Sequence, residues 1–184
     1  MDTALIEKEA WENVLKKIPQ NNIEKIYNLL PDGKKALVTP ILLPDEEYIK
    51  VWEAQTYVGN PYPFGNTSYF TAKGEQVRSK SEILIANTLR DYGIPYRYEY
   101  PIIIDGVTKY IDFYTLNVRT REEFIFEHFG MLDDKGYAID NTDKFNRFIA
   151  NGYLPGKNFI FTMETSRNPI NVQIVEKIIR EYLL

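Results

Sequence analysis

The chain has 184 residues, which is enough for one domain with a sizeable core and too few for two average domains. Hydrophobic residues make up 44% and aromatic residues 14% of the chain, far from the composition of a disordered protein. It has no cysteine and one histidine, which excludes disulfides, thiolate metal sites and a cysteine nucleophile. A formal net charge of -4 argues against non-specific coating of nucleic acid, because that binding relies on basic contacts with phosphates.

The N-terminal third is predicted to hold two short helices and an ordered connector. Apolar residues recur at helical spacing over residues 5–18 and 23–30, and each run ends before a proline. Residues 37–70 are rich in Pro, Gly and Tyr, with one acidic helical stretch at 45–52. We expect the aromatic side chains of this connector to pack against the domain; the alternative is an exposed surface for base stacking.

From Ser79 onward the pattern predicts an α/β domain with helices flanking a mixed sheet. A helix follows Ser79 and ends at a Gly-Ile-Pro sequence, and Asp105-Gly106 marks a hairpin between two strands. The predicted elements are a helix over 79–92, strands over 96–104, 108–114 and 124–129, a helix over 141–151, a strand over 159–162 and a helix over 172–184. We therefore divide the chain into an N-terminal segment, 1–66, and a domain, 67–184.

Two acidic residues lie in strands that are otherwise apolar. Asp112 stands between Ile111 and Phe113, and strand alternation places it on the face opposite to both. Glu127 lies within a phenylalanine-rich strand, where an ionised carboxylate is costly unless it is paired, protonated or bound to a metal. Two such acids on neighbouring strands could share one divalent cation, and oxygen ligands suit Mg²⁺ or Mn²⁺. The alternative is that each acid pairs with a nearby base, among Lys109, Arg119 and Arg121.

The order of these acids resembles the PD-(D/E)XK, or restriction-endonuclease-like, nuclease superfamily. That family carries an acid on a helix, an Asp on a hairpin and an acid on the next strand, followed by a helix and a strand; Glu82, Asp112 and Glu127 fall in those places. Residues 74–82, 93–99 and 126–131 also look like stretches of an uncharacterised bacterial group in this superfamily, which has a Glu-His-Phe-Gly variant of the last motif. The resemblance implies an α-β-β-β-α-β core and Mg²⁺-dependent hydrolysis of phosphodiester bonds, in DNA in preference to RNA.

One position departs from the family pattern. The superfamily usually has a lysine two residues after the second strand acid, and this chain has Phe129 there. Because some members carry the base on a neighbouring helix, Lys144 is the predicted replacement; the alternative is a solvated helix charge near Asp140 or a partner of Asp143. His128 points to the strand face opposite to Glu127 and is expected to act through its backbone carbonyl, as a metal ligand beside Asp112, Glu127 and Glu82.

Glu82 has two competing interpretations. The sequence from Ser79 to Glu82 matches a capping box, in which the glutamate hydrogen-bonds back to the start of the helix. The family resemblance instead implies that Glu82 binds a second ion or a metal-bound water. Arg78 and Lys80 are candidates for phosphate binding at this helix N-terminus, and a solvated basic pair is the alternative.

The rival function is a binding module, a nuclease-like fold that lost its chemistry with the strand lysine and now binds nucleic acid or protein. We find no secretory signal pattern and no apolar run long enough to span a membrane, so we expect a cytoplasmic protein without a membrane partner. Formation of a homodimer stays open.

Overall fold

The computed structural model describes residues 27–37, 43–65 and 68–184, and the helix predicted over 5–18 lies outside this part of the chain. The chain divides into two compact units, residues 1–48 and 49–184. The first contains the short helix α3 (Asp32–Lys35), and helix α4 (Asp45–Glu53) contains the boundary. Helix α4 confirms the helical stretch predicted at 45–52. The domain boundary predicted after residue 66 stays a prediction.

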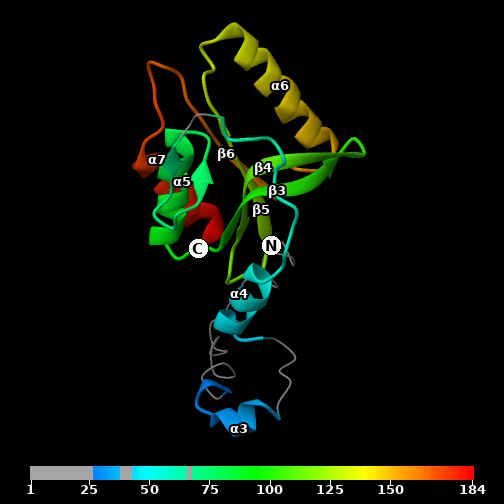
Figure 1. Ribbon diagram of the computed structural model, residues 1–184, viewed down its shortest axis with the longest axis vertical. Helices are drawn as coiled ribbons and strands as arrows, with labels where there is room; N and C mark the ends of the chain where they lie inside the picture. Colours follow the sequence, from blue (N-terminus) through cyan, green and yellow to red (C-terminus); the bar gives the residue numbers. More distant parts are fainter. Residues whose placement is uncertain (1–26, 38–42, 66–67) are drawn as a thin grey trace, which may run out of the picture. The chain divides into compact units, whose positions relative to one another are not determined.

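A four-stranded mixed sheet forms the centre of the second unit (Figure 1). Its strand order is β3-β4-β5-β6, with antiparallel pairing up to β5 and parallel pairing between β5 and β6. The strands are β3 (Tyr96–Ile104), β4 (Val107–Leu116), β5 (Glu123–Phe129) and β6 (Phe159–Met163). All four strands were predicted from the sequence. The two-stranded ribbon of β1 (Tyr69–Phe70) and β2 (Gln76–Val77) was not.

Helices cover both faces of this sheet. Helix α5 (Lys80–Asp91), helix α7 (Val172–Ile178) and the π-helical turn Ile179–Leu183 share one apolar cluster with the sheet. Helix α6 (Lys135–Ala150) packs through Phe148 on a second cluster, and Figure 1 shows it apart from α5 and α7. The predicted mixed α/β fold, with helices flanking a mixed sheet, is therefore confirmed. No helix among the described residues is long and apolar enough to cross a membrane.

Helix α6 begins at Lys135, six residues before the predicted start at 141. The carboxylate of Asp134 caps it by accepting hydrogen bonds from the amides of Gly136 and Tyr137. The sequence placed the start of this helix at 141 because the first two turns show little apolar periodicity. The capping acid, rather than an apolar face, starts this helix.

The connector just before the domain packs on the sheet through its aromatic residues. Trp52 is 2% exposed, stacks on Tyr114 and lies beneath the guanidinium of Arg97 at 3.9 Å from the ring centroid. The hydroxyl of Tyr57 donates to the carbonyl of Tyr98 at 2.8 Å. These contacts agree with the expected packing role, whereas Tyr62 stays 70% exposed.

At one point along their length, strands β3 and β4 both switch the sheet faces toward which their side chains point. Residues two apart in a strand ordinarily share a face. Tyr98 nevertheless packs in the α5 cluster and Tyr100 in the α6 cluster, and Phe113 and Ile111 divide in the same way. The predicted placement of Asp112 opposite both Ile111 and Phe113 is therefore wrong, because those two side chains lie on different faces.

The residue between Tyr98 and Tyr100 explains this change. Glu99 has φ of 49°, a left-handed conformation that is rare in strands, and the pairing of β3 with β4 skips Glu99 and Asp112. A residue in this conformation turns the following side chains to the other face. The sheet thus opens locally at two acidic residues, and this opening positions the candidate site.

Candidate metal and carboxylate centre

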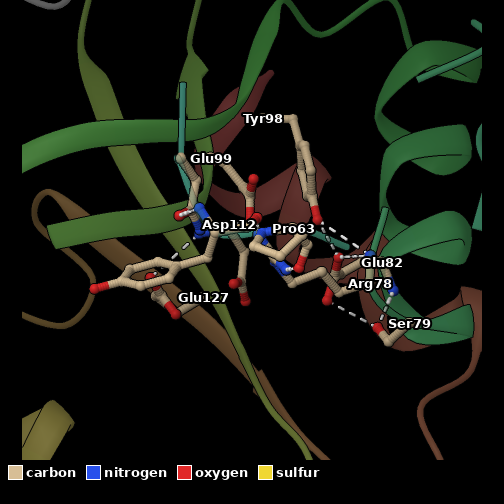
Figure 2. Close-up of polar contacts among 10 residues, drawn as sticks. Pro63, Arg78, Ser79, Glu82, Tyr98, Glu99, Asp112 and Glu127 are labelled. Carbon is tan, nitrogen blue, oxygen red and sulfur yellow. Dashed lines mark hydrogen bonds and ion pairs between the residues drawn. The ribbon is translucent and has the colours of Figure 1, made fainter. Parts of the chain in front are cut away.

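Asp112 and Glu127 join β4 to β5 through their side chains at the point where the pairing of the two strands ends (Figure 2). The pairing of these strands ends at Phe113 and Phe126. Next to that pair, the amide of Asp112 donates to Oε1 of Glu127 at 3.3 Å, and the amide of His128 donates to Oδ2 of Asp112 at 2.7 Å. Carboxylates replace backbone carbonyls as acceptors here. The structure therefore brings together the two strand acids that the sequence singled out.

Lys144 reaches the same centre from α6. Its Nζ lies 2.5 Å from Oε2 of Glu127, whose side chain is fully buried, while the lysine side chain is 38% exposed. Burial and the charge of Asp112 raise the pKa of Glu127 to about 8, against the lowering effect of Lys144. Burial alone would lower the pKa of Lys144, but the charges of Glu127 and Asp112 raise it above its usual value. The ammonium is thus the main compensation for a buried acid.

Glu82 acts as a helix cap and also faces the centre. The hydroxyl of Ser79 accepts from the amide of Glu82 at 3.1 Å, and the carboxylate accepts from the Ser79 hydroxyl, the Arg78 amide and the Tyr98 hydroxyl. Burial and the charge of Asp112 raise its pKa, whereas these hydrogen bonds lower it. Figure 2 shows Asp112 between Glu82 and Glu127. The capping interpretation is therefore confirmed, and a role for Glu82 in binding an ion or a metal-bound water stays a prediction.

Glu99 is a fourth acid at this centre, and the sequence interpretation missed it. Its Oε1 lies 2.5 Å from Nε of Arg78 and accepts from the Asn60 amide at 2.9 Å. Its side chain is 11% exposed. The available signal was the one applied to Asp112, an acid inside a Tyr- and Ile-rich strand. We overlooked it because the predicted strand appeared regular there.

The two basic residues predicted to bind phosphate are placed differently. Every side-chain nitrogen of Arg78 already has a partner, because Nε contacts Glu99, Nη1 donates to the carbonyl of Pro63 and Nη2 to that of Tyr62. Its guanidinium also lies over the ring of Phe64. Lys80 is exposed at the first residue of α5. The geometry thus favours a structural clamp for Arg78, and phosphate binding stays a prediction for both.

The imidazole of His128 points away from Asp112 and Glu127, to the opposite side of β5. Its Nδ1 is 2.8 Å from the hydroxyl of Thr162, and its Nε2 is 3.1 Å from Oε1 of Glu164. The Ser81 hydroxyl donates to the same oxygen of Glu164. Burial alone would raise the pKa of Glu164, but hydrogen bonds from its neighbours lower it. The imidazole thus belongs to a buried network that joins α5 to β5 and β6, as its alternation predicted.

Phe129, at the position of the family lysine, is 1% exposed and packs edge-on against Phe145 and Phe159. No basic group can act from there. A basic group on α6 is instead in contact with Glu127.

The residues present suit a magnesium ion in part. Among the residues that the structure describes, no group of three or more His, Asp or Glu side chains is arranged to hold a metal ion. Mg²⁺, however, keeps several waters and is commonly held by one or two carboxylates together with substrate phosphates. Asp112 and Glu127 form such a pair, and burial, followed by the charge of Asp112, raises the pKa of Glu127. Two carboxylates therefore match part of the donor set that this ion takes, and binding of the ion stays a prediction.

Comparisons with known proteins do not extend the assignment, since no protein-family model matches the chain and no curated protein shows a significant match. The fold and the site define an α/β protein whose mixed sheet opens around a carboxylate centre with one lysine.

Proposed function

We propose that this protein is a metal-dependent nuclease of the PD-(D/E)XK type, which hydrolyses phosphodiester bonds with DNA as the expected substrate. The observation that supports this most is the contact of 2.5 Å between Lys144 and the buried Glu127, which adjoins Asp112. The family needs two acids and a base at one place. Here the base comes from α6, while the usual position is held by Phe129.

The order of elements supports the same proposal. The chain runs α5, β3, β4, β5, α6 and β6, the order of the family's α-β-β-β-α-β core. Glu82 lies on α5, Asp112 on the β3–β4 hairpin and Glu127 on β5. Each acid thus occupies the element on which the family carries its own.

In the proposed mechanism Asp112 and Glu127, with the backbone carbonyl of His128, hold Mg²⁺ or Mn²⁺. When bound, such an ion would lower the pKa of a water ligand and would neutralise charge on the scissile phosphate. Lys144 orients the Glu127 carboxylate, and its partly exposed ammonium can donate to a phosphate oxygen. Glu82, held by the Tyr98 hydroxyl at 2.6 Å, accepts a hydrogen bond from the attacking water.

The second candidate is a nucleic-acid or protein-binding module without catalysis. Two observations favour it, the phenylalanine at the lysine position and the lack of any three-ligand group among residues 27–37, 43–65 and 68–184. Calorimetric titration with Mn²⁺ separates the candidates. An enzyme should bind Mn²⁺ and lose that binding in Glu127→Ala, whereas a module that needs no ion should give no heat.

The direct test incubates the protein with single-stranded, duplex and branched DNA and with RNA, in Mg²⁺ or Mn²⁺. We expect cleavage that Asp112→Ala and Asp112→Asn both abolish. Glu122→Gln is the matched control. It removes one negative charge, as Asp112→Asn does, but from an exposed residue just before β5. Cleavage that survives both substitutions of Asp112 would refute the site assignment.

A further inference from the structure

A pocket lies beside the carboxylate centre, between the β3–β4 hairpin and α6. Its volume is about 400 Å³, within the range of small-molecule sites. Ile104 and Phe148 give it an apolar lining, and Tyr110 adds an aromatic hydroxyl. Lys144 lines the pocket and also contacts Glu127 of the carboxylate centre. A ligand in this pocket therefore lies next to the site of the proposed chemistry.

The hairpin and the helix that form the pocket are joined at their far ends. The amide of Asp105, in the hairpin turn, donates to the side-chain oxygen of Asn151 at 3.0 Å. The side-chain nitrogen of Asn151 donates back to Oδ1 of Asp105 at 2.9 Å. This reciprocal pair ties the C-terminal end of α6 to the hairpin. The two walls of the pocket are thus connected to each other by side-chain hydrogen bonds at this end.

Two cations of the pocket are available to a ligand. Lys109 on β4 and Arg147 on α6 are exposed, and neither makes an ion pair within the part of the chain that the structure describes. Each comes from a different wall, so a strand that lies between them could contact both, each through its own phosphate. Arginine and lysine are the residues that bind phosphate oxygens most strongly in proteins.

Two acids of α6 also line the pocket and restrict what it can hold. Asp140 and Asp143 precede Lys144 and Arg147 by four residues each, an arrangement that favours attraction along a helix. They reduce the net positive charge, so a free phosphate ion would gain little here. A strand that is already held at the carboxylate centre would instead reach the pocket at high effective concentration.

We propose that this pocket binds the phosphodiester backbone of a nucleic-acid strand beside the scissile bond, with Lys109 and Arg147 as the phosphate contacts. The proposal rests on the proposed function, because that function places the strand at the carboxylate centre beside the pocket. It gives the protein a local nucleic-acid surface despite a net charge of -4.

The test measures binding of fluorescein-labelled single-stranded and duplex DNA to the full chain by anisotropy, in EDTA and over a series of NaCl concentrations. The double variant Lys109→Ala/Arg147→Ala should weaken binding about tenfold or more, as loss of charge-assisted hydrogen bonds does. For duplex DNA, the slope of log affinity against log salt should fall by about 2, because each phosphate contact contributes about 0.9.

The matched control is Arg167→Ala/Lys177→Ala, which removes the same charge from exposed positions outside the pocket. It should change affinity by less than half as much on a logarithmic scale. Asp140→Asn/Asp143→Asn should tighten binding. If the Lys109 and Arg147 variant matches the control in affinity and salt slope, the pocket is not a backbone site. Equal competition by inorganic phosphate and by oligonucleotide phosphate would also overturn the proposal, since it would indicate a free-anion site.

Failure of this inference and failure of the proposed function give different results. If the protein does not cleave DNA but the Lys109→Ala/Arg147→Ala variant loses DNA binding, the pocket proposal is supported and the nuclease proposal is refuted. If the wild-type protein is a nuclease and the variant has the same KM and kcat, the pocket proposal is refuted and the proposed function stands. If both proposals hold, the variant should raise KM and leave kcat unchanged, because neither residue contacts the carboxylates.

Discussion

Replacing Glu127 with glutamine should stabilise the metal-free protein at alkaline pH. The carboxylate is fully buried, and its pKa is raised to about 8 from an ordinary 4.5 by burial and by repulsion from Asp112. A raised folded pKa means that the folded protein holds a proton more tightly than the unfolded chain. The stability from this group is therefore complete below pH 4.5 and is lost as pH rises towards 8.

The size of the effect follows from the shift in pKa. One pKa unit corresponds to 1.36 kcal/mol, so the full shift of Glu127 sets an upper bound of about 5 kcal/mol. Lys144 shares this titration, and its side chain is partly solvent-screened, which reduces the expected loss to about 2 kcal/mol. The loss should be absent in Glu127→Gln, because the amide keeps the shape and carries no charge.

Urea unfolding in EDTA at pH 5 and pH 9 measures this difference. Wild type should lose about 2 kcal/mol relative to Glu127→Gln between these values. Subtracting the variant removes the contribution of every other titrating group that the two proteins share. Glu122→Gln controls for the loss of one exposed acid and should follow wild type. Parallel pH profiles for wild type and Glu127→Gln would show that Glu127 does not carry the raised pKa and would refute the reasoning.

Two further substitutions test the contacts around the centre. Lys144→Met should destabilise the metal-free protein by about 2 kcal/mol at pH 8, because it leaves the buried carboxylate of Glu127 without its ammonium partner. In a Glu127→Gln background the same substitution should cost less than half as much. Equal costs in the two backgrounds, measured by urea unfolding, would contradict the pairing. Arg78→Lys should loosen the preceding loop, since lysine cannot keep the contacts of the guanidinium with Glu99 and the carbonyls of Pro63 and Tyr62. Chymotrypsin should then cut after Phe64, whose ring lies under the Arg78 guanidinium, faster than in wild type, and an unchanged rate of cutting would exclude the clamp.

Local patterns in the sequence were sufficient for most of the secondary structure. The helix after Ser79, the hairpin at Asp105-Gly106 and strands β5 and β6 all have signals within a few residues of themselves. Helix α6 was predicted too short because its first turns depend on one capping carboxylate. The change of face in β3 and β4 had no local signal, since it depends on Glu99 being held by Arg78 and Asn60 from elsewhere in the chain.

The candidate site was predictable only where its residues have a signal in the local sequence. Asp112 and Glu127 were found because an acid in an apolar strand needs compensation, and the structure places them in contact. Whether Lys144 would reach them could not be calculated, because the contact depends on how α6 packs across the sheet. Its role in catalysis stays a prediction.

The charges at the centre bear on the choice between the two candidate functions. Four carboxylates gather there, those of Glu82, Glu99, Asp112 and Glu127, and each has at least one hydrogen bond from the protein. Two cations, Arg78 and Lys144, are paired with them. With every group ionised, two negative charges remain, which is the charge that one divalent cation neutralises. A module without an ion would have to keep this excess negative charge in a largely buried place, at a cost in stability. An ion-binding enzyme would recover that stability when the ion binds, since a ligand that binds the folded state stabilises it.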